Sequence, residues 1–189
     1  MNTPAHLLIG AALFSGRDNT KLLTGALLSG MLPDLSLYLM AGISIFVLNI
    51  SPDVVFNEYY FSSSWQFVFS IDNSIVIWGI LLAVSLKYRN AFFIALTSAA
   101  LLHLVFDFAL HHDDARIHFW PLSNWKFESP ISYWDSNHHA FYVAPVEGII
   151  STIATIYLLT DRFHIGIKAG LLILFLAELF TLSSWLRYS

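Results

Sequence analysis

Apolar residues dominate the chain in long runs, and short polar stretches separate these runs. Runs of about 20 apolar residues are typical of helices that span a bilayer. The pattern predicts a short helix at 4–15 and five spans, near residues 22–48, 71–86, 91–110, 141–160 and 169–186. The segment 4–15 is too short to span alone, and Asn2-Thr3-Pro4 ahead of it favours a helix start with proline in the first turn.

One predicted span and two connecting segments depart from this simple pattern. Pro33-Asp34 interrupts the span 22–48, and the nearby Gly30 makes a broken helix more favourable there. The segments 49–70 and 111–139 are polar and rich in Phe, Tyr and Trp, which is typical of a membrane interface. Asp72-Asn73-Ser74 is a capping sequence that is expected to open the span 71–86.

Composition agrees with a membrane protein. Of the 189 residues 57% are hydrophobic and only 12% are charged, against about 25% in soluble domains, and the mean hydropathy is +0.65. We therefore predict an all-α polytopic membrane helix bundle, with residues 1–189 as one integral membrane domain and the lipid bilayer as its partner. The first 17 residues lack a basic segment and a cleavage site, so we expect them to be retained.

Charge and cysteine content exclude several kinds of site. The net charge is −4 and no long basic run is present, so nucleic acid is not an expected partner. The chain has no cysteine, which removes disulfides, thiolate metal sites and cysteine nucleophiles. Histidine, aspartate and glutamate remain as the chemically active residues.

The positions of Lys and Arg predict the orientation. With five spans, one side of the membrane receives Arg17, Lys21, Lys87, Arg89, Arg162 and Lys168, and the other receives Arg116, Lys126 and Arg187. Positive charge concentrates on the cytoplasmic side of membrane proteins. The aromatic segments are therefore expected on the opposite side, facing the periplasm or the cell exterior.

Ionisable residues appear where the span 91–110 should be apolar. His103, Asp107 and His111 follow one another at intervals of four, so they share one helix face, and Asp114 lies about one further turn along. Each ionisable group inside a span costs about 2.5–3.5 kcal/mol on insertion scales, so such groups are rarely kept without a role. Imidazole and carboxylate on a shared face favour a divalent cation such as zinc or manganese.

Further ionisable residues reach a similar depth from other segments. At 1.5 Å per helical residue, His6, Asp34 and His103 lie about 16–21 Å from the nearest predicted cytoplasmic cation, and Glu147 about 22 Å. Convergence in one site is one interpretation. In the others, His6 is interfacial, Asp34 only caps the helix after Pro33, and Glu147 is a first-turn acid favoured by the helix dipole.

Four short motifs, in order along most of the chain, carry a family resemblance. They are the early His6, Leu32-Pro33-Asp34, Leu102-His103-Leu104-Val105-Phe106-Asp107 and Trp120-Pro121-Leu122. In these the chain resembles the membrane-bound metal-dependent hydrolases of bacteria, a family that includes the LexA-binding inner-membrane proteins and is distantly similar to zinc-dependent phospholipase C. The resemblance implies an inner-membrane location and metal-binding roles for His6, Asp34, His103 and Asp107.

The chain also departs from that family. Family members usually have a His-Arg-Gly-x-Thr-His-like motif where this chain has Ser70-Ile71-Asp72-Asn73-Ser74, so two expected histidines are missing. Either the run His111-His112-Asp113-Asp114-x-Arg116-x-His118 replaces them, or this branch has lost catalysis.

The same run is also similar to sequences described as cobalamin biosynthesis proteins of the CobQ type. A cobyric acid synthase resembles a phosphate-binding enzyme with a glutamine amidotransferase, and this chain has neither a Gly-rich Lys-Ser/Thr loop nor a cysteine. That description therefore does not fit the residues present.

Together these patterns predict a metal-dependent hydrolase of an ester or phosphoester, with a lipid among the possible substrates. The predicted ligands of the zinc or manganese ion are His6, Asp34, His103 and Asp107, with His118 and Glu147 as further candidates. The residues His111, His112, Asp113 and Asp114 would be more ligands or a general acid and base, and Arg116 would steady an anionic phosphate.

Two other classes of protein remain open. A metal or proton transporter also places acids and histidines at mid-depth, but it needs a polar path to the cytoplasmic side, which the half-spans 22–32 and 91–102 do not offer. A non-catalytic membrane scaffold would use the same cluster as a structural metal site.

Overall fold

Helices form every regular element in the computed structural model, which describes residues 1–188, and their side chains as far as Ser184. In chain order the elements are α1 (Thr3–Phe14), α2 (Thr20–Ser29), η1 (Leu32–Asp34), α3 (Leu35–Gly42), η2 (Ile43–Val47), α4 (Pro52–Val54), η3 (Val55–Tyr59), α5 (Ser63–Asp72), α6 (Ile75–Lys87), α7 (Ala91–Leu110), η4 (Ser136–His138), α8 (Ala140–Thr160) and α9 (Ile165–Tyr188).

Five stretches of helix are long and apolar enough to cross a bilayer. They are Thr20–Val47, Ser63–Lys87, Ala91–Leu110, Ala140–Thr160 and Ile165–Ser184, and α1 is a shorter apolar helix beside them. The predicted all-α bundle of five spans plus a short N-terminal helix is thus confirmed, and the chain is a multi-pass membrane protein.

The second span begins earlier than the sequence pattern predicted. The predicted cap Asp72-Asn73-Ser74 is confirmed, because the Ser74 hydroxyl accepts a hydrogen bond from the backbone N–H of Ile77 at 3.1 Å at the start of α6. The span nevertheless starts at Ser63, because a further helix, α5, precedes α6 and is capped by the Ser62 hydroxyl, which accepts from the backbone N–H of Trp65. The side chains of Trp65 and Phe69 are buried against α3 and its neighbours, so this part of the aromatic segment packs as helix.

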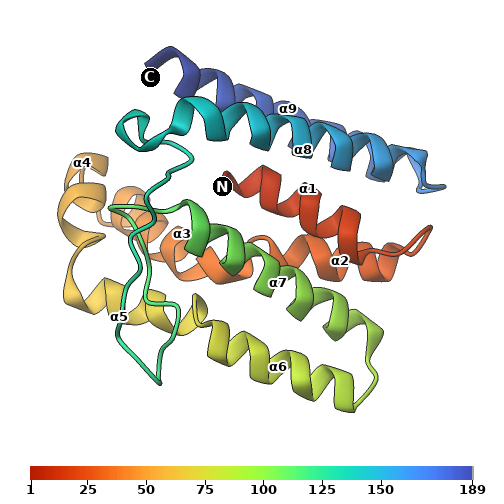
Figure 1. The fold of residues 1–189 in the computed structure, drawn as a ribbon, viewed down its shortest axis with the longest axis horizontal. Coiled ribbons are helices and arrows are strands. Elements are labelled where there is room, and N and C mark those ends of the chain that lie inside the picture. Colours follow the sequence, from red (N-terminus) through yellow and green to blue (C-terminus); the bar gives the residue numbers. More distant parts are fainter. Residues whose placement is uncertain (189) are drawn as a thin grey trace.

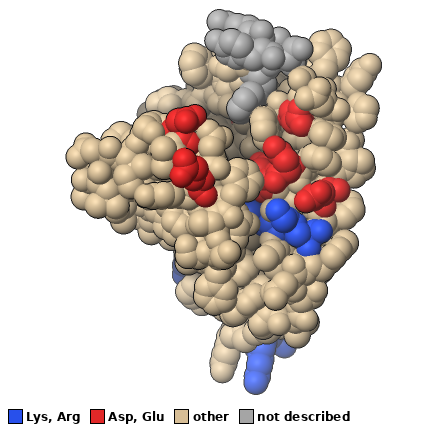
Figure 2. Space-filling model, turned by 90° about the vertical axis from the view of Figure 1, so that its left-hand side faces the viewer, with Lys and Arg blue, Asp and Glu red and all other residues tan. Residues whose placement is uncertain are grey.

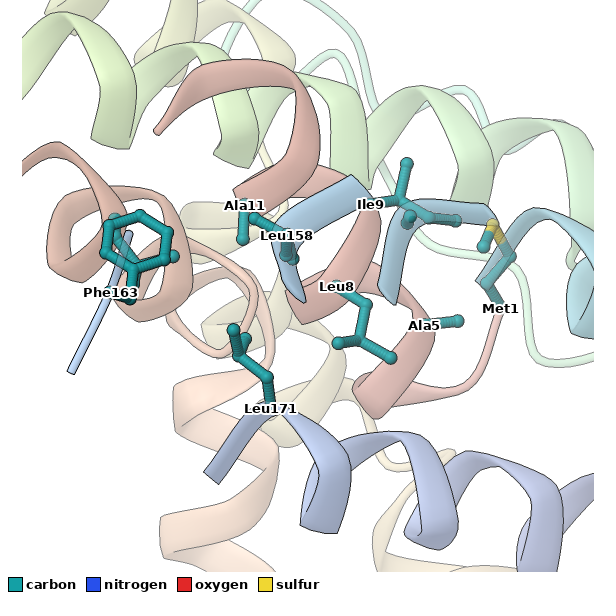
Figure 3. Close-up of a cluster of buried hydrophobic side chains, with 10 residues drawn as sticks. Met1, Ala5, Leu8, Ile9, Ala11, Leu158, Phe163 and Leu171 are labelled. Carbon is teal, nitrogen blue, oxygen red and sulfur yellow. The ribbon is translucent and has the colours of Figure 1, made fainter. Parts of the chain in front are cut away.

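The short helix α1 is the centre of the bundle. It packs against α2, α7, α8 and α9 (Figure 1). Because it touches helices on all sides, every residue from Ala5 to Ala11 is buried. Figure 3 shows Ala5, Leu8 and Ile9 of α1 packed with Leu158 of α8 and Leu171 of α9, in a cluster that also holds Met1, Ala11, Leu23, Ala154 and Phe163.

Small residues let α1 approach its neighbours closely. A Cβ atom added at Gly10 would lie 3.2 Å from the Cβ of Ala99 on α7. A Cβ atom added at Gly30, at the end of α2, would lie 2.7 Å from Leu7 Cδ2 and 3.1 Å from Leu7 Cα. Since Leu7 follows His6, the close contact at Gly30 fixes the position of that histidine.

The predicted break at Pro33-Asp34 is present. The chain leaves α2 at Gly30, makes the single turn η1, and resumes as α3. A proline breaks the backbone hydrogen bonding of a helix, and a carbonyl freed within a membrane needs another donor. Here the Asn73 side-chain amide donates to the carbonyl oxygen of Pro33 at 2.7 Å, so the break is held by the junction between α5 and α6.

The two ends of the bundle differ in their charge. The α1–α2, α6–α7 and α8–α9 connections lie together at one end (Figure 1) and hold Arg17, Arg89 and Arg162. The adjoining helix ends hold Lys21 of α2, Lys87 of α6 and Lys168 of α9. The segment 111–139 and α4 lie at the other end, where acidic side chains gather on the surface (Figure 2). Arg116 and Lys126 belong to this second end, and the side chain of Arg187 lies outside the described residues.

The topology can be tested with cysteines placed in this cysteine-free chain. Ser123→Cys lies in the exposed segment 111–139 and Asn90→Cys in the exposed α6–α7 connection, and neither change alters the charge that sets the orientation. In intact cells an impermeant thiol reagent should label Cys at 123 and leave Cys at 90 unlabelled until the membrane is opened. Labelling of both from outside would contradict the orientation.

The close packing of α1 can be tested with two glycines. Gly30→Ala should lower the free energy of unfolding by about 1–3 kcal/mol, because the new methyl group meets the backbone of Leu7. Gly79→Ala in α6 is the matched control: no atom lies within 4 Å of its Cβ, so helix propensity alone should make it neutral or stabilising by up to about 1 kcal/mol. Thermal unfolding in detergent measures both, and equal effects would contradict the packing argument.

Candidate metal centre

Asp107 is the hub of the cluster of ionisable residues. It lies on α7, is only 3% exposed, and is one helical turn from His103 on one side and His111 on the other. His103 Nε2 is 2.9 Å from Asp107 Oδ2, and His111 Nε2 is 3.3 Å from Asp107 Oδ1. His103 and Asp107 therefore share one face of α7 as predicted, whereas His111 reaches Asp107 from the extended residue that ends the helix.

Two other helical segments add their residues to this group. From α1, His6 Nε2 lies 3.0 Å from Asp107 Oδ1, and its ring stacks on His103 with ring centroids 3.7 Å apart. From the turn η1, Asp34 Oδ2 lies 3.4 Å from His103 Nε2. Four predicted ligands thus meet in one place, and the broken helix is what brings Asp34 there.

The ligand atoms have the spacing of a metal site. One atom from each of His6, His103 and Asp107 lies within 4.8 Å of the other two, and all three residues are buried. Zinc bonds of about 2.0–2.1 Å in a tetrahedral site place neighbouring ligand atoms roughly 3.3 Å apart. The distances of 2.9–3.4 Å among these imidazole and carboxylate groups are close to that value.

The alignment of His103 also favours a shared cation. Although His103 Nε2 is 2.9 Å from a carboxylate oxygen of Asp107, it has no partner with hydrogen-bond geometry among the described residues. Buried polar atoms normally have a partner. A cation between nitrogen and oxygen would supply one for both.

A pocket of about 650 Å³ opens onto this cluster. Asp34 and Asp107 belong to its wall, and buried His6 and His103 contact these two carboxylates. The pocket lies at the acidic end of the bundle, where Figure 2 shows acidic side chains close to a basic one. Its other charged lining residues are His111, Asp113, Asp114 and Arg116.

Aromatic residues from two segments cover the pocket. Phe56, Tyr60 and Phe61 come from the first aromatic segment, and Tyr133 and Trp134 come from the second. The two segments are joined directly, because the Tyr60 hydroxyl donates to the carbonyl oxygen of Asp114 at 3.2 Å.

His111 and Asp114 form a pair at the mouth of the centre. His111 Nδ1 lies 2.9 Å from Asp114 Oδ2, which also accepts a hydrogen bond from the Trp134 indole at 3.2 Å. Burial alone would lower the pKa of His111, but the neighbouring Asp107 carboxylate outweighs it and raises that pKa. Burial alone would raise the pKa of Asp114, but the His111 contact outweighs it and lowers that pKa.

Arg116 is buried under the aromatic cover. Its guanidinium carbon lies 4.7 Å from the ring centroid of Tyr60 and 4.2 Å from that of Phe69, which are cation–π distances. Its Nη1 has no hydrogen-bond partner among the described residues. A buried donor without a partner, in the wall of a pocket, suits an anionic ligand.

Three predicted site residues lie apart from the centre. His112 Nδ1 contacts the carbonyl oxygen of Ser129 at 2.7 Å, and its ring stacks on His138. His118 Nδ1 contacts the carbonyl oxygen of Asn73 at 3.0 Å. Glu147, on α8, accepts a hydrogen bond from the backbone N–H of Asn2 at 2.6 Å. The structure does not bring these three into the group around Asp107.

Some residues of the site were missed in the sequence. Tyr133 packs its ring 5.1 Å from that of His111, and Asn73 supports the break beside Asp34. Glu178, in the middle of α9, is buried with its Oε1 accepting from the Asn2 side chain, so it belongs with Glu147. The sequence indicated a role for Glu178 only through its position as an acid inside an apolar span, and nothing in the sequence indicated its partner.

No protein-family model, curated protein or solved structure matches this chain.

Metal content tests the centre directly. Wild-type protein should carry stoichiometric zinc or manganese, and Asp107→Asn should weaken metal affinity by more than about 100-fold, because it removes the carboxylate charge that contacts the imidazoles of His6, His103 and His111. His138→Ala is the control, since His138 contacts Asp135 in the outer segment and should leave metal binding unchanged. Elemental analysis after gentle purification measures the content.

A wild-type protein that neither carries metal nor gains it from added zinc or manganese would contradict this prediction. The cluster would then be a hydrogen-bonded network that holds the broken helix against α7.

Proposed function

We propose that this protein is a metal-dependent hydrolase of an ester or phosphoester, acting at the outer half of a bacterial inner membrane. One observation carries the proposal: His6, His103 and Asp107 converge with metal-ligand spacing beside a polar pocket that reaches Asp34 and Asp107. With no cysteine in the chain, the donor set is nitrogen and oxygen, which suits zinc or manganese.

The bound cation would supply Lewis acidity, lowering the pKa of a coordinated water and polarising the oxygen under attack. His6, His103, Asp107 and Asp34 would hold it. Water from the cytoplasmic side would be excluded from the centre by the contact between α1 and α7. Gly10 and Ala99, one turn beyond His6 and His103, bring the two helices together there.

His111 and Asp114 are suited to move the proton. His111 lines the pocket, with Nδ1 held by Asp114 and Nε2 3.3 Å from Asp107. When Asp107 holds the cation, Nε2 would be free to exchange a proton with the substrate, while Asp114 orients the ring. Asp113, exposed in the same wall, is a second proton acceptor. His112 is directed to Ser129 and is not given a catalytic role.

Arg116 would bind the anionic group of the substrate. Its position is fixed by the rings of Tyr60 and Phe69, so a phosphate could meet a guanidinium that needs little reordering. Four acids also line the pocket, at 34, 107, 113 and 114. A phosphate would be repelled by them without a cation, so the proposed ligand and the proposed metal depend on each other.

A transporter is the less favoured function. It needs a polar route to the cytoplasmic side, and the contact between Gly10 and Ala99 closes the space between α1 and α7 on that side of the histidines. A scaffold with a structural metal would need no pocket of about 650 Å³ beside its metal.

His103→Ala separates these functions. For a hydrolase it should abolish metal binding and hydrolysis of bis(p-nitrophenyl) phosphate together, while the protein stays folded on its apolar spans. For a scaffold it should chiefly lower the unfolding temperature, because a structural metal contributes folding energy. For a transporter it should reduce metal or proton flux in proteoliposomes, with no hydrolysis by the wild type. Metal-loaded wild-type protein without esterase or phosphoesterase activity would contradict the proposal.

A further inference from the structure

A second hollow lies on the lipid-facing side of the bundle, next to the metal centre. It has a volume of about 600 Å³, within the range of about 300–1,000 Å³ that is usual for ligand pockets. Its walls come from the outer ends of two spans, with Phe106, Ala109 and Leu110 on α7 and Val143, Val146 and Ile150 on α8. Glu147 on α8 is also part of the wall, and its Oε1 accepts a hydrogen bond from the backbone N–H of Asn2. We call this hollow the α7–α8 groove.

The groove exists because α7 and α8 are held apart by α1. In Figure 1 α1 lies between them, and it packs on both. Met1, two residues before α1, lines the groove between the two spans. The side chains of Ala109 and Val146 remain exposed there, although both belong to membrane spans, so hydrocarbon is the medium that reaches them.

The groove runs in the direction of a lipid chain. Its upper rim is formed by His139 and Tyr142, and Tyr142 is 70% exposed, as befits a tyrosine at headgroup level. Ile150 lies eleven positions below His139, so the groove descends about 16 Å along α8. An acyl chain whose headgroup lies at the interface occupies that range of depth.

The groove also adjoins the metal centre. Met1 lines both the α7–α8 groove and the polar pocket. Phe106 lines the groove, precedes Asp107 in α7, and has its ring centroid 6.3 Å from that of His6. Met1 is therefore a wall shared by the two spaces, and a molecule with a charged head in the pocket and an apolar chain in the groove would lie across Met1, beside the proposed ligands.

We infer that the α7–α8 groove binds one acyl chain of a membrane phospholipid whose phosphate group occupies the polar pocket. The inference rests on the proposed function for the reaction, and it names the substrate class as a lipid phosphoester taken laterally from the bilayer. Transfer of a chain from bilayer to groove gains little free energy, because both are apolar. The groove instead orients the scissile bond, and orientation is a large part of catalysis.

The test fills the groove without touching the metal centre. Val146→Trp places an indole in the groove, and Ile149→Trp is the matched control on the same helix: the two wild-type side chains are 54% and 60% exposed, but only Val146 lines the groove. Native mass spectrometry in mild detergent should find a phospholipid retained by the wild type and by Ile149→Trp, and lost from Val146→Trp.

Hydrolysis gives a second measurement. With dioleoyl phosphatidylglycerol vesicles, Val146→Trp should lower kcat/KM at least about tenfold through misplacement of the lipid, and it should leave hydrolysis of water-soluble bis(p-nitrophenyl) phosphate unchanged. The proposed lipid site would be contradicted if Val146→Trp and Ile149→Trp retained phospholipid equally. It would also be contradicted if Val146→Trp lowered hydrolysis of the lipid and of the water-soluble substrate by the same factor. If the wild type hydrolyses neither substrate, the proposed function fails, and lipid retention alone decides the groove.

Discussion

A single buried carboxylate sets the requirements for the rest of this fold. Asp107 lies within a membrane span and is almost fully enclosed, and a charge in such a place costs several kcal/mol unless partners compensate it. The compensating partners are imidazoles: His103 on its own helix, His111 directly after that helix, and His6 on α1. Asp34, from the break in the first span, also contacts His103. The short central helix and the broken span are therefore tied to the same few atoms.

Much of this arrangement could be read from the sequence, because its signals are local. The five spans and the short helix follow from runs of apolar residues, and the break follows from Pro33. His103 and Asp107 share a face because four residues make about one helical turn. His6 and Asp34 could be predicted to lie near His103 and Asp107, because the rise per helical residue gives the depth of each residue in the membrane even on separate spans.

The sequence could not predict how each helix is rotated about its own axis, or the direction in which individual side chains point. Depth alone placed Glu147 with the metal ligands, but α8 faces Asn2 and Glu178 at that level, so the two acids form a separate buried group. His112 differs from His111 by one position, and that step turns its ring towards Ser129 and His138. The start of α5 was also missed. The Ser62 hydroxyl caps this helix, but the aromatic residues around it had indicated an interfacial segment.

The central position of α1 has a consequence for biosynthesis. This helix leaves the ribosome before every span that encloses it, and it is too short to cross the bilayer by itself. Its contacts with α8 and α9 join residues far apart in the chain, so they form only after the last hairpin has entered the membrane. His6 can meet Asp107 once α7 is in place, but α1 becomes enclosed only when α8 and α9 pack on it. The centre would therefore be assembled before it is buried, and it would stay open to the bilayer until the last two spans have joined.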